Sequence, residues 1–304
     1  MKSTQNITSE SLKAYSNSIG VDKIGWFDSS NFPKYLKAID ERRELYNFQY
    51  KSFEQFLSAG YSGSQYNTII VLVVDYFFDN NYTKDDFKIS NYTRFCWQTI
   101  EPKADLIINY LEDRGYRSER ANTPDRAAAC KAGLGFIGKN CMFYAYDIGS
   151  YVGIRTIGTD FKFNENNEHD EQTVNAFCAK CNKCVNVCPT QCINNEGYKI
   201  NPTKCISFIN RHAEEPSKIY PDDINQLGGW LQGCEICQDI CPLNANIKHK
   251  KQVTFSKGID LYGMKLKNRN SISKNELIEK MKEVNSVEYK RYIGEYLLEL
   301  KEQK

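Results

Sequence analysis

The segment FCAKCNKCVNVCPTQC, residues 177–192, places five cysteines in sixteen positions and is the feature that most constrains this chain. Its first four cysteines follow the spacing Cys-x2-Cys-x2-Cys-x3-Cys-Pro, which is typical of thiolates that bind iron–sulfur clusters. Two-residue gaps let one loop present three thiolates to a single cluster. The fourth cysteine of such a run ligates the other cluster in two-cluster proteins. The segment therefore predicts a metal centre.

A second, incomplete cysteine motif follows downstream, as Cys234-x2-Cys237-x3-Cys241 with a proline directly after it. Cys205 lies between the two motifs and is placed to supply the missing ligand. Eight cysteines then suffice for two [4Fe–4S] clusters. We predict that one cluster is held by Cys178, Cys181, Cys184 and Cys241, and the other by Cys188, Cys205, Cys234 and Cys237.

Other uses of these cysteines fit the pattern less well. Structural zinc prefers paired Cys-x2-Cys knuckles, and three thiolates followed by Cys-Pro suit it poorly. Disulfides are rare in the cytoplasm. Four cysteines remain outside the predicted ligand set, and each is expected to be a small buried side chain; they are Cys96, Cys130, Cys141 and Cys192.

The distribution of cysteine and apolar residues predicts a compartment. Nine of the twelve cysteines fall between Cys178 and Cys241, which is too uneven for a small disulfide-stapled secreted domain. The N-terminal residues contain no apolar run suited to a signal peptide, and no segment approaches the roughly 20 apolar residues that cross a bilayer. We therefore expect a soluble, cytoplasmic protein with no membrane partner. The net charge of +2 neither requires nor excludes a nucleic-acid partner.

Alternating helix and strand patterns predict an α/β domain over residues 1–165. The β-branched run 67–78 is expected to form a strand buried on both faces, and 101–115 an amphipathic helix that Gly115 ends. Residues 127–160 are expected to begin as an alanine-rich helix and to continue into a loop and two strands.

The rest of the chain is expected to form two smaller units. The polar segment 160–172 is predicted to be a surface linker. Residues 170–250 then form a ferredoxin-like domain with two clusters, and 251–304 a short basic helical extension. A simple electron carrier would need only the cysteine-rich third, so the clusters are expected to serve chemistry in the α/β domain. An electron carrier whose α/β domain binds a partner protein is the alternative from a different class.

Several motifs in one order resemble the epoxyqueuosine reductase family: KAGLGFIGKN (131–140), GSYVG (149–153), CISF (205–208) and GGWLQGCEICQDICPLN (228–244). The resemblance implies an oxidoreductase related in architecture to reductive dehalogenases. Its first domain would have a nitroreductase-like fold and bind cobalamin, which the two clusters would reduce. The reaction it implies is the last step of queuosine synthesis in tRNA, with an electron-donor protein as a further partner. A related corrinoid reductase acting on a non-tRNA substrate is the alternative.

The resemblance also implies where cobalamin binds. Lys139, Asn140 and Ser150 lie in glycine-flanked polar turns, where the backbone can approach a large ligand closely. Ser207 follows the predicted ligand Cys205 by two residues and is expected near the corrin from the cluster side. The pattern alone favours glycines that only shape loops between strands, and the resemblance reverses this preference.

The family's proton donor is an aspartate before a Glu-Arg pair, and this chain departs from that pattern. It reads ERANTPDR, with Asp125-Arg126 where Glu-Arg is expected. A count without a gap puts Glu119 at the catalytic position, whereas a three-residue deletion puts Asn122 there, which has no acidic proton. We expect Glu119 to be the acid, buried beside the macrocycle, and Asp125 is the nearby alternative.

Overall fold

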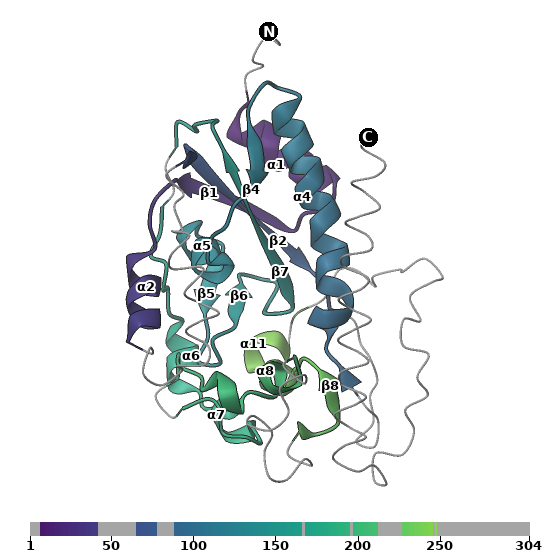
Figure 1. The fold of residues 1–304 in the computed structure, drawn as a ribbon, viewed down its shortest axis with the longest axis vertical. Coiled ribbons are helices and arrows are strands. Elements are labelled where there is room, and N and C mark those ends of the chain that lie inside the picture. The colour runs from purple at the N-terminus through teal and green to yellow at the C-terminus, as the bar shows by residue number, and fades with distance from the viewer. Residues whose placement is uncertain are drawn as a thin grey trace, which may run out of the picture.

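The computed structural model describes residues 7–41, 65–77, 88–165, 168–194, 197–211, 227–245 and 247. It shows a mixed α/β part that carries the cysteine-rich segment at one end of its sheet (Figure 1). The predicted helical extension, 251–304, lies outside the described residues. Within the part of the chain that is described, no helix has the length and apolar character needed to span a bilayer.

The α/β part is built on a four-stranded sheet in the order β1-β2-β7-β4, and every neighbouring pair is antiparallel. β2 and β7 pair along their full lengths, with Ile70 opposite Ile157. The strands are β1 (Lys23–Asp28), β2 (Thr68–Asp75), β4 (Ser118–Arg120) and β7 (Val152–Thr159). β2 and β7 are therefore central, and β4 is an edge strand.

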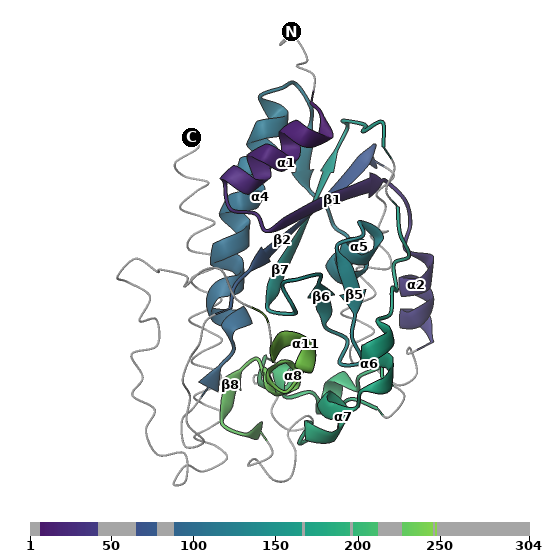
Figure 2. The ribbon, with the colours of Figure 1, turned by 180° about the vertical axis from the view of Figure 1, so that it is seen from behind.

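Strand β2 is buried on both faces, as its β-branched run predicted. Ile70 and Leu72 pack into a core under helices α1 (Ser9–Ser18) and α4 (Trp97–Glu112), while Ile69 and Val71 pack under α2 (Pro33–Asp40) and α5 (Asp125–Lys131). The two helical layers lie on opposite faces of the sheet (Figures 1 and 2). The α/β part thus has three layers: one pair of helices, the sheet, and a second pair of helices. β2 contributes side chains to both helix–sheet interfaces.

Local signals explain the ends of the main helices. Thr8 caps α1 through a reciprocal hydrogen-bond pair with Ser11. The predicted helix 101–115 begins earlier, at Trp97, as a continuation of the π-helical turn η2 (Tyr92–Cys96). It ends where Gly115 adopts a positive φ of 90°.

Residues 127–160 form one strand more than predicted. After α5 come the hairpin strands β5 (Gly135–Ile137) and β6 (Phe143–Ala145), and then β7. A Cβ on Gly135 would lie 2.0 Å from the carbonyl oxygen of Tyr144, so the hairpin requires glycine there. The hairpin extends from the sheet toward the cysteine-rich segment (Figure 2).

The predicted linker 160–172 is only partly a surface linker. Phe161 and Phe163 are buried, and the ring of Phe163 stacks on Trp26 with centroids 4.2 Å apart. Because two aromatic side chains anchor its first residues in the α1–α4 core, this part of the prediction is wrong. The polar residues beyond them lead to the cysteine-rich segment.

The cysteine-rich segment folds into short helices at the end of the sheet, below β5 and β6 in Figure 1. Its strand β8 (Trp230–Gln232) pairs in parallel with β3 (Lys88–Ile89), which precedes α4 in the chain. Backbone hydrogen bonds therefore join the two parts. The remaining elements are α6 (Ala176–Lys180), α7 (Lys183–Val187), η3 (Pro202–Lys204), α8 (Ile206–Arg211), α10 (Ile236–Asp239) and α11 (Pro242–Ala245).

Candidate active site

The structure brings together the four cysteines predicted for the first cluster. Cys178 and Cys241 are buried and pack with Phe136 and Tyr144 of the β5–β6 hairpin. Cys184 lies within electrostatic range of Cys178, Cys181 and Cys241. The group therefore combines three cysteines of α6, α7 and the turn between them with one that directly precedes α11.

The four cysteines predicted for the second cluster also converge. Cys237 interacts electrostatically with Cys188 and Cys205, and Cys234 interacts with all three of them. Cys184 of the first group lies within range of Cys237, so the two groups are neighbours.

Peptide N–H groups point at several of these sulfurs. The Lys139 N–H donates to Cys178 Sγ at 3.4 Å. Backbone N–H groups of Val185, Ile236 and Ser207 are directed at Cys184, Cys234 and Cys205 respectively. Hydrogen bonds of this kind stabilise negative charge on ligand sulfur and are characteristic of iron–sulfur sites. The donor set therefore fits the predicted clusters.

The buried thiols need a metal in order to ionise. Desolvation raises the pKa of Cys184 to about 11 and that of Cys178 above its usual value. It also raises the pKa of Cys234 and of Cys237. Since a bound metal deprotonates a coordinating thiol outright, metal binding would supply the charge that the N–H groups then stabilise.

Lys139 and Asn140, predicted as cobalamin contacts, lie between the hairpin and the cysteines. Both are buried, and the Lys139 Nζ donates to Asn182 Oδ1 at 2.7 Å. Asn140 Nδ2 donates to the Tyr144 hydroxyl at 3.0 Å and to the Cys237 carbonyl at 3.4 Å. The structure thus places these two side chains against both groups of cysteines.

Ser150 also lies where the α/β part contacts the cysteine-rich segment. Its N–H donates to Asn244 Oδ1 at 2.9 Å, and its hydroxyl contacts Gln238 Oε1 at 3.0 Å. Ser207 is the second residue of α8, close to Cys205 in the chain, and is half-buried. Ser150, like Lys139 and Asn140, therefore joins the α/β part to the cysteine-rich segment, and we call this contact region the seam.

The seam also contains acidic and phenolic groups that the sequence analysis did not single out. Glu235, between two predicted ligands, is buried and binds the Asn91 side chain at 3.1 Å. Burial, with the nearby Asp239, raises the pKa of Glu235 to about 8. The Tyr151 hydroxyl donates to Asp239, and the buried Tyr76 hydroxyl has no hydrogen-bond partner among the described residues.

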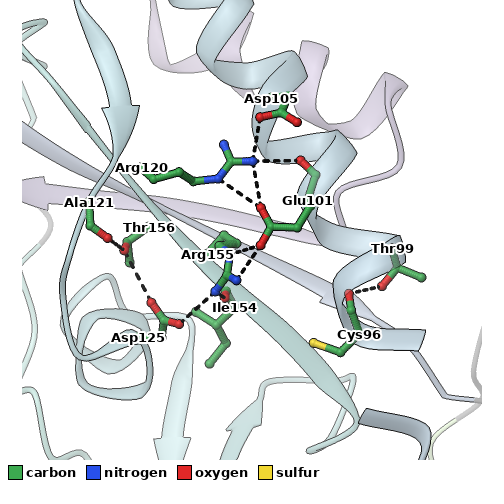
Figure 3. Close-up of polar contacts among 10 residues, drawn as sticks. All are labelled: Cys96, Thr99, Glu101, Asp105, Arg120, Ala121, Asp125, Ile154, Arg155 and Thr156. Atoms are coloured by element: carbon green, nitrogen blue, oxygen red, sulfur yellow. Dashed lines mark hydrogen bonds and ion pairs between the residues drawn. The ribbon is translucent and has the colours of Figure 1, made fainter. Parts of the chain in front are cut away.

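A charged network joins side chains of α4, β4, α5 and β7 (Figure 3). Arg155 contacts Asp125 Oδ2 at 3.4 Å, pairs with Glu101 of α4, and lies 3.9 Å from the ring centre of Trp97. Arg155 is the one charged residue in the strand VGIRTIGT, which is the signal that could have identified it. The network places a carboxylate, a guanidinium and an aromatic face together.

Asp125, the alternative acid, belongs to this network. Thr156 donates to its Oδ1 at 3.4 Å, and its side chain keeps 36% exposure. Desolvation nevertheless raises its pKa to about 6, against the opposing effect of Arg155. A carboxyl of this kind is partly protonated near neutral pH and remains accessible, as a general acid must be.

Glu119 does not have the surroundings that we expected. It lies exposed on the edge strand β4, opposite Gly158 near the far end of β7, and accepts a hydrogen bond from the Tyr66 hydroxyl at 2.8 Å. The seam adjoins the other end of β7, because Ser150 directly precedes Tyr151 and Val152 there. The predicted burial of Glu119 is therefore wrong, and the structure does not bring it to Lys139, Asn140 or Ser150.

A shallow hollow of about 290 Å³ lies elsewhere, beside α1 and β1. None of the predicted site residues lines it; its lining residues are Lys13, Asn17, Asp22, Lys23, Ile24, Gly133, Leu134 and Tyr146. The cysteine groups and the seam are therefore the better candidate for the site.

Comparison with protein families supports the metal assignment. Residues 177–244 match the model of a 4Fe-4S double cluster binding domain. These bounds contain every predicted ligand.

Two sequence relatives that match most of this chain are both named epoxyqueuosine reductase. The chain is 29% identical to the epoxyqueuosine reductase of Bacillus subtilis (strain 168) over 256 residues, which are 77% of this chain and 63% of that protein. It is 24% identical to the epoxyqueuosine reductase of Cellulophaga algicola over 303 residues, covering 96% of this chain and 95% of that protein. The chain thus spans less than two thirds of the Bacillus relative but nearly all of the Cellulophaga one.

Solved structures agree. A crystal structure of epoxyqueuosine reductase with an epoxyqueuosine-modified tRNA-Tyr stem loop has 25% identity and a TM-score of 0.64, over 79% of this chain and 66% of that one. A reductive dehalogenase structure, described with a mechanism for B12-dependent dehalogenation, has 15% identity and a TM-score of 0.55, over 83% and 34%. The second likeness concerns the fold alone. The resemblance stated from the motifs is thereby confirmed: this chain is similar to epoxyqueuosine reductases in sequence and in fold.

Proposed function

We propose that this protein is a cobalamin- and iron–sulfur-dependent reductase that converts epoxyqueuosine in tRNA to queuosine. The observation that carries the proposal is the pair of cysteine groups packed through the seam against an α/β part similar to that of epoxyqueuosine reductases. Electrons from a donor protein would enter through the clusters. The tRNA would bring the epoxide to the α/β part, whose fold we take to be nitroreductase-like.

The ligand assignment follows the two convergent groups. Cys178, Cys181, Cys184 and Cys241 would hold the first cluster, and Cys188, Cys205, Cys234 and Cys237 the second. Backbone N–H groups at Cys178, Cys184, Cys205 and Cys234 stabilise thiolate charge, which supports this assignment. The match to a double cluster binding domain supports it independently.

Cobalamin is proposed as the second cofactor, at the seam. When bound there, it would supply cobalt of very low reduction potential for the removal of the epoxide oxygen. The buried Tyr76 hydroxyl, which has no hydrogen-bond partner in the described part of the chain, is a polar atom that a ligand in the seam would satisfy. Lys139, Asn140 and Ser150 would border the cofactor while holding the cysteines, and Ser207 would face it from the cluster side.

The proton for the departing oxygen is proposed to come from Asp125. Its pKa of about 6 keeps a fraction protonated near neutral pH, and Thr156 and Arg155 fix the orientation of the carboxyl (Figure 3). Glu119 stays the candidate of the ungapped alignment. Its exposure and its position near the far end of β7 favour Asp125.

Queuosine analysis tests the substrate. A strain that lacks its own epoxyqueuosine reductase would express this chain, and digested tRNA would be examined by mass spectrometry. We expect queuosine to replace epoxyqueuosine, and Cys205→Ser, which removes a proposed cluster ligand, to abolish the conversion. If epoxyqueuosine persists although the purified protein contains both clusters, the tRNA substrate is wrong.

A second experiment tests cobalamin binding against the electron-carrier alternative. Anaerobically purified protein would be titrated with cobalamin, and the absorption spectrum of the corrinoid would be followed. A saturable spectral change at micromolar protein supports an enzyme, whereas an unchanged spectrum in cluster-loaded protein supports an electron carrier.

A further inference from the structure

A fifth cysteine belongs to the second cysteine group. Cys192 is buried, with 5% exposure, and its Sγ lies 3.4 Å from Cys188 Sγ. It also lies beside the thiol of Cys205. The structure confirms that Cys192 is buried, but it is in contact with two proposed ligands and is not merely a small core side chain.

The backbone holds Cys192 in this position from both sides. Gln191 adopts a left-handed conformation, with φ of 52°, and its N–H donates to the Cys188 carbonyl at 3.1 Å. Beyond Cys192, Ile193 forms an antiparallel bridge with Ile200. A non-glycine residue in the left-handed region is uncommon and carries strain. The tight turn at Gln191 therefore directs Cys192 back toward Cys188.

Cys192 is too close to Cys188 to be a ligand of the same cluster. Each iron of a [4Fe–4S] cluster takes one cysteine sulfur, and the cluster keeps these sulfurs apart. Two sulfurs in van der Waals contact therefore cannot bind different irons. Four other cysteines already complete the second group, so Cys192 remains a thiol whose S–H is a hydrogen-bond donor.

We propose that Cys192 is a positioning residue whose S–H donates to the Cys188 sulfur, a proposed ligand of the second cluster, and raises the reduction potential of that cluster. The inference rests on the two clusters of the proposed function. A hydrogen bond to a ligand sulfur stabilises the added negative charge of the reduced cluster, and such bonds help to set cluster potentials. The second cysteine group thereby gains a side-chain hydrogen-bond donor in addition to its peptide N–H donors.

The test compares anaerobic Cys192→Ala and Cys192→Ser with Cys130→Ala, which changes a buried cysteine in the α5 core. Iron content and potentials would be measured, the latter by redox titration followed by electron paramagnetic resonance. We expect all three variants to keep about eight irons, since each cluster holds four. Cys192→Ala should lower the potential of one cluster by ~59 mV, which is about tenfold in a one-electron equilibrium.

Cys192→Ser keeps a donor and should restore most of the wild-type potential, while Cys130→Ala should change neither cluster. An unchanged potential in Cys192→Ala, or an equal shift in Cys130→Ala, would overturn the inference. Loss of about half the iron in Cys192→Ala would also overturn it, because Cys192 would then be a ligand. Wild-type protein with zinc and little iron would instead remove the proposed clusters themselves.

Discussion

At the scale of single residues, the site depends on which side chains can change charge. Burial raises the pKa of Cys184 and of Cys234 and so disfavours the free thiolate there. The hydrogen bond from Cys192 lowers the pKa of Cys188 to about 5. The desolvated cysteines would ionise as the metal binds.

Cys205→Ser should remove one cluster and leave the other. Cys205 lies in the second group only, and serine is a poor replacement for a thiolate. Iron and acid-labile sulfide should fall from about eight to about four per chain. Metal analysis of anaerobic protein measures this, with Cys130→Ala as the control. Loss of all iron would show that the two clusters assemble as one unit, and stoichiometric zinc would contradict the assignment.

Asp125→Asn should abolish most turnover without loss of clusters. Removing a general acid typically costs about 10²–10⁴-fold in rate. Since the pKa of Asp125 is about 6, the protonated donor is lost as pH rises through 6, and the single-turnover rate of the wild type should fall there. The variant should lack this dependence.

Glu119→Gln is the matched control for Asp125→Asn, because it removes the exposed carboxyl that the ungapped alignment selects. We expect it to keep the wild-type rate and pH profile. A full-rate Asp125→Asn together with an inactive Glu119→Gln would return the role to Glu119. If both variants remain active, neither carboxyl donates the proton.

At the scale of elements, the sequence predicted the features that depend on residues close together in the chain. The apolar run of β2 was sufficient because it describes one contiguous segment. Arg155 was missed because its partners, Glu101 and Asp125, come from two helices distant in sequence. The linker was misjudged because Phe161 and Phe163 are only two aromatics in a polar stretch, and their burial depends on Trp26.

Leu72→Ala should destabilise the protein strongly. Leu72 is fully buried in β2 and packs under α1 and α4, so the change leaves a cavity in the central layer. The expected loss is about 2–5 kcal/mol of unfolding free energy. Anaerobic urea denaturation measures it. Leu106→Ala removes a leucine of α4 with 41% exposure and should cost no more than about 0.5 kcal/mol. Equal losses would contradict the central role of β2.

At the scale of the whole molecule, the seam makes the two parts interdependent. The parallel pairing of β3 with β8 crosses it, as do contacts of Lys139, Asn140 and Ser150 with the cysteine-rich segment. The sequence identified these three residues from glycine-flanked turns, but not the protein groups that they bind. Gly149 illustrates why, because a Cβ there would meet Asn244 Oδ1 at 2.4 Å, a contact between distant segments.

Asn244→Ala should loosen the seam. Asn244 accepts from the Ser150 N–H and donates to the Gln238 carbonyl, each at 2.9 Å. Leaving these groups without partners should cost about 1–3 kcal/mol. Iron should then pass faster to a chelator, which absorbance at the cluster bands would follow. Asn186→Ala changes an exposed asparagine of α7 and serves as the control. Equal rates would show that Asn244 does not hold the seam.

The interleaved order of the proposed ligands turns each cluster into a cross-link. Cys184 and Cys241 would meet at the first cluster, while Cys188 and Cys234 would meet at the second, so the loop between the motifs is tied twice. Bringing together the ends of a long loop costs conformational entropy. The metal–ligand bonds of the two clusters would offset this cost. Damage by oxygen would therefore release the loop as well as interrupt electron flow. Proteolytic cleavage between the motifs should then increase in step with cluster decay.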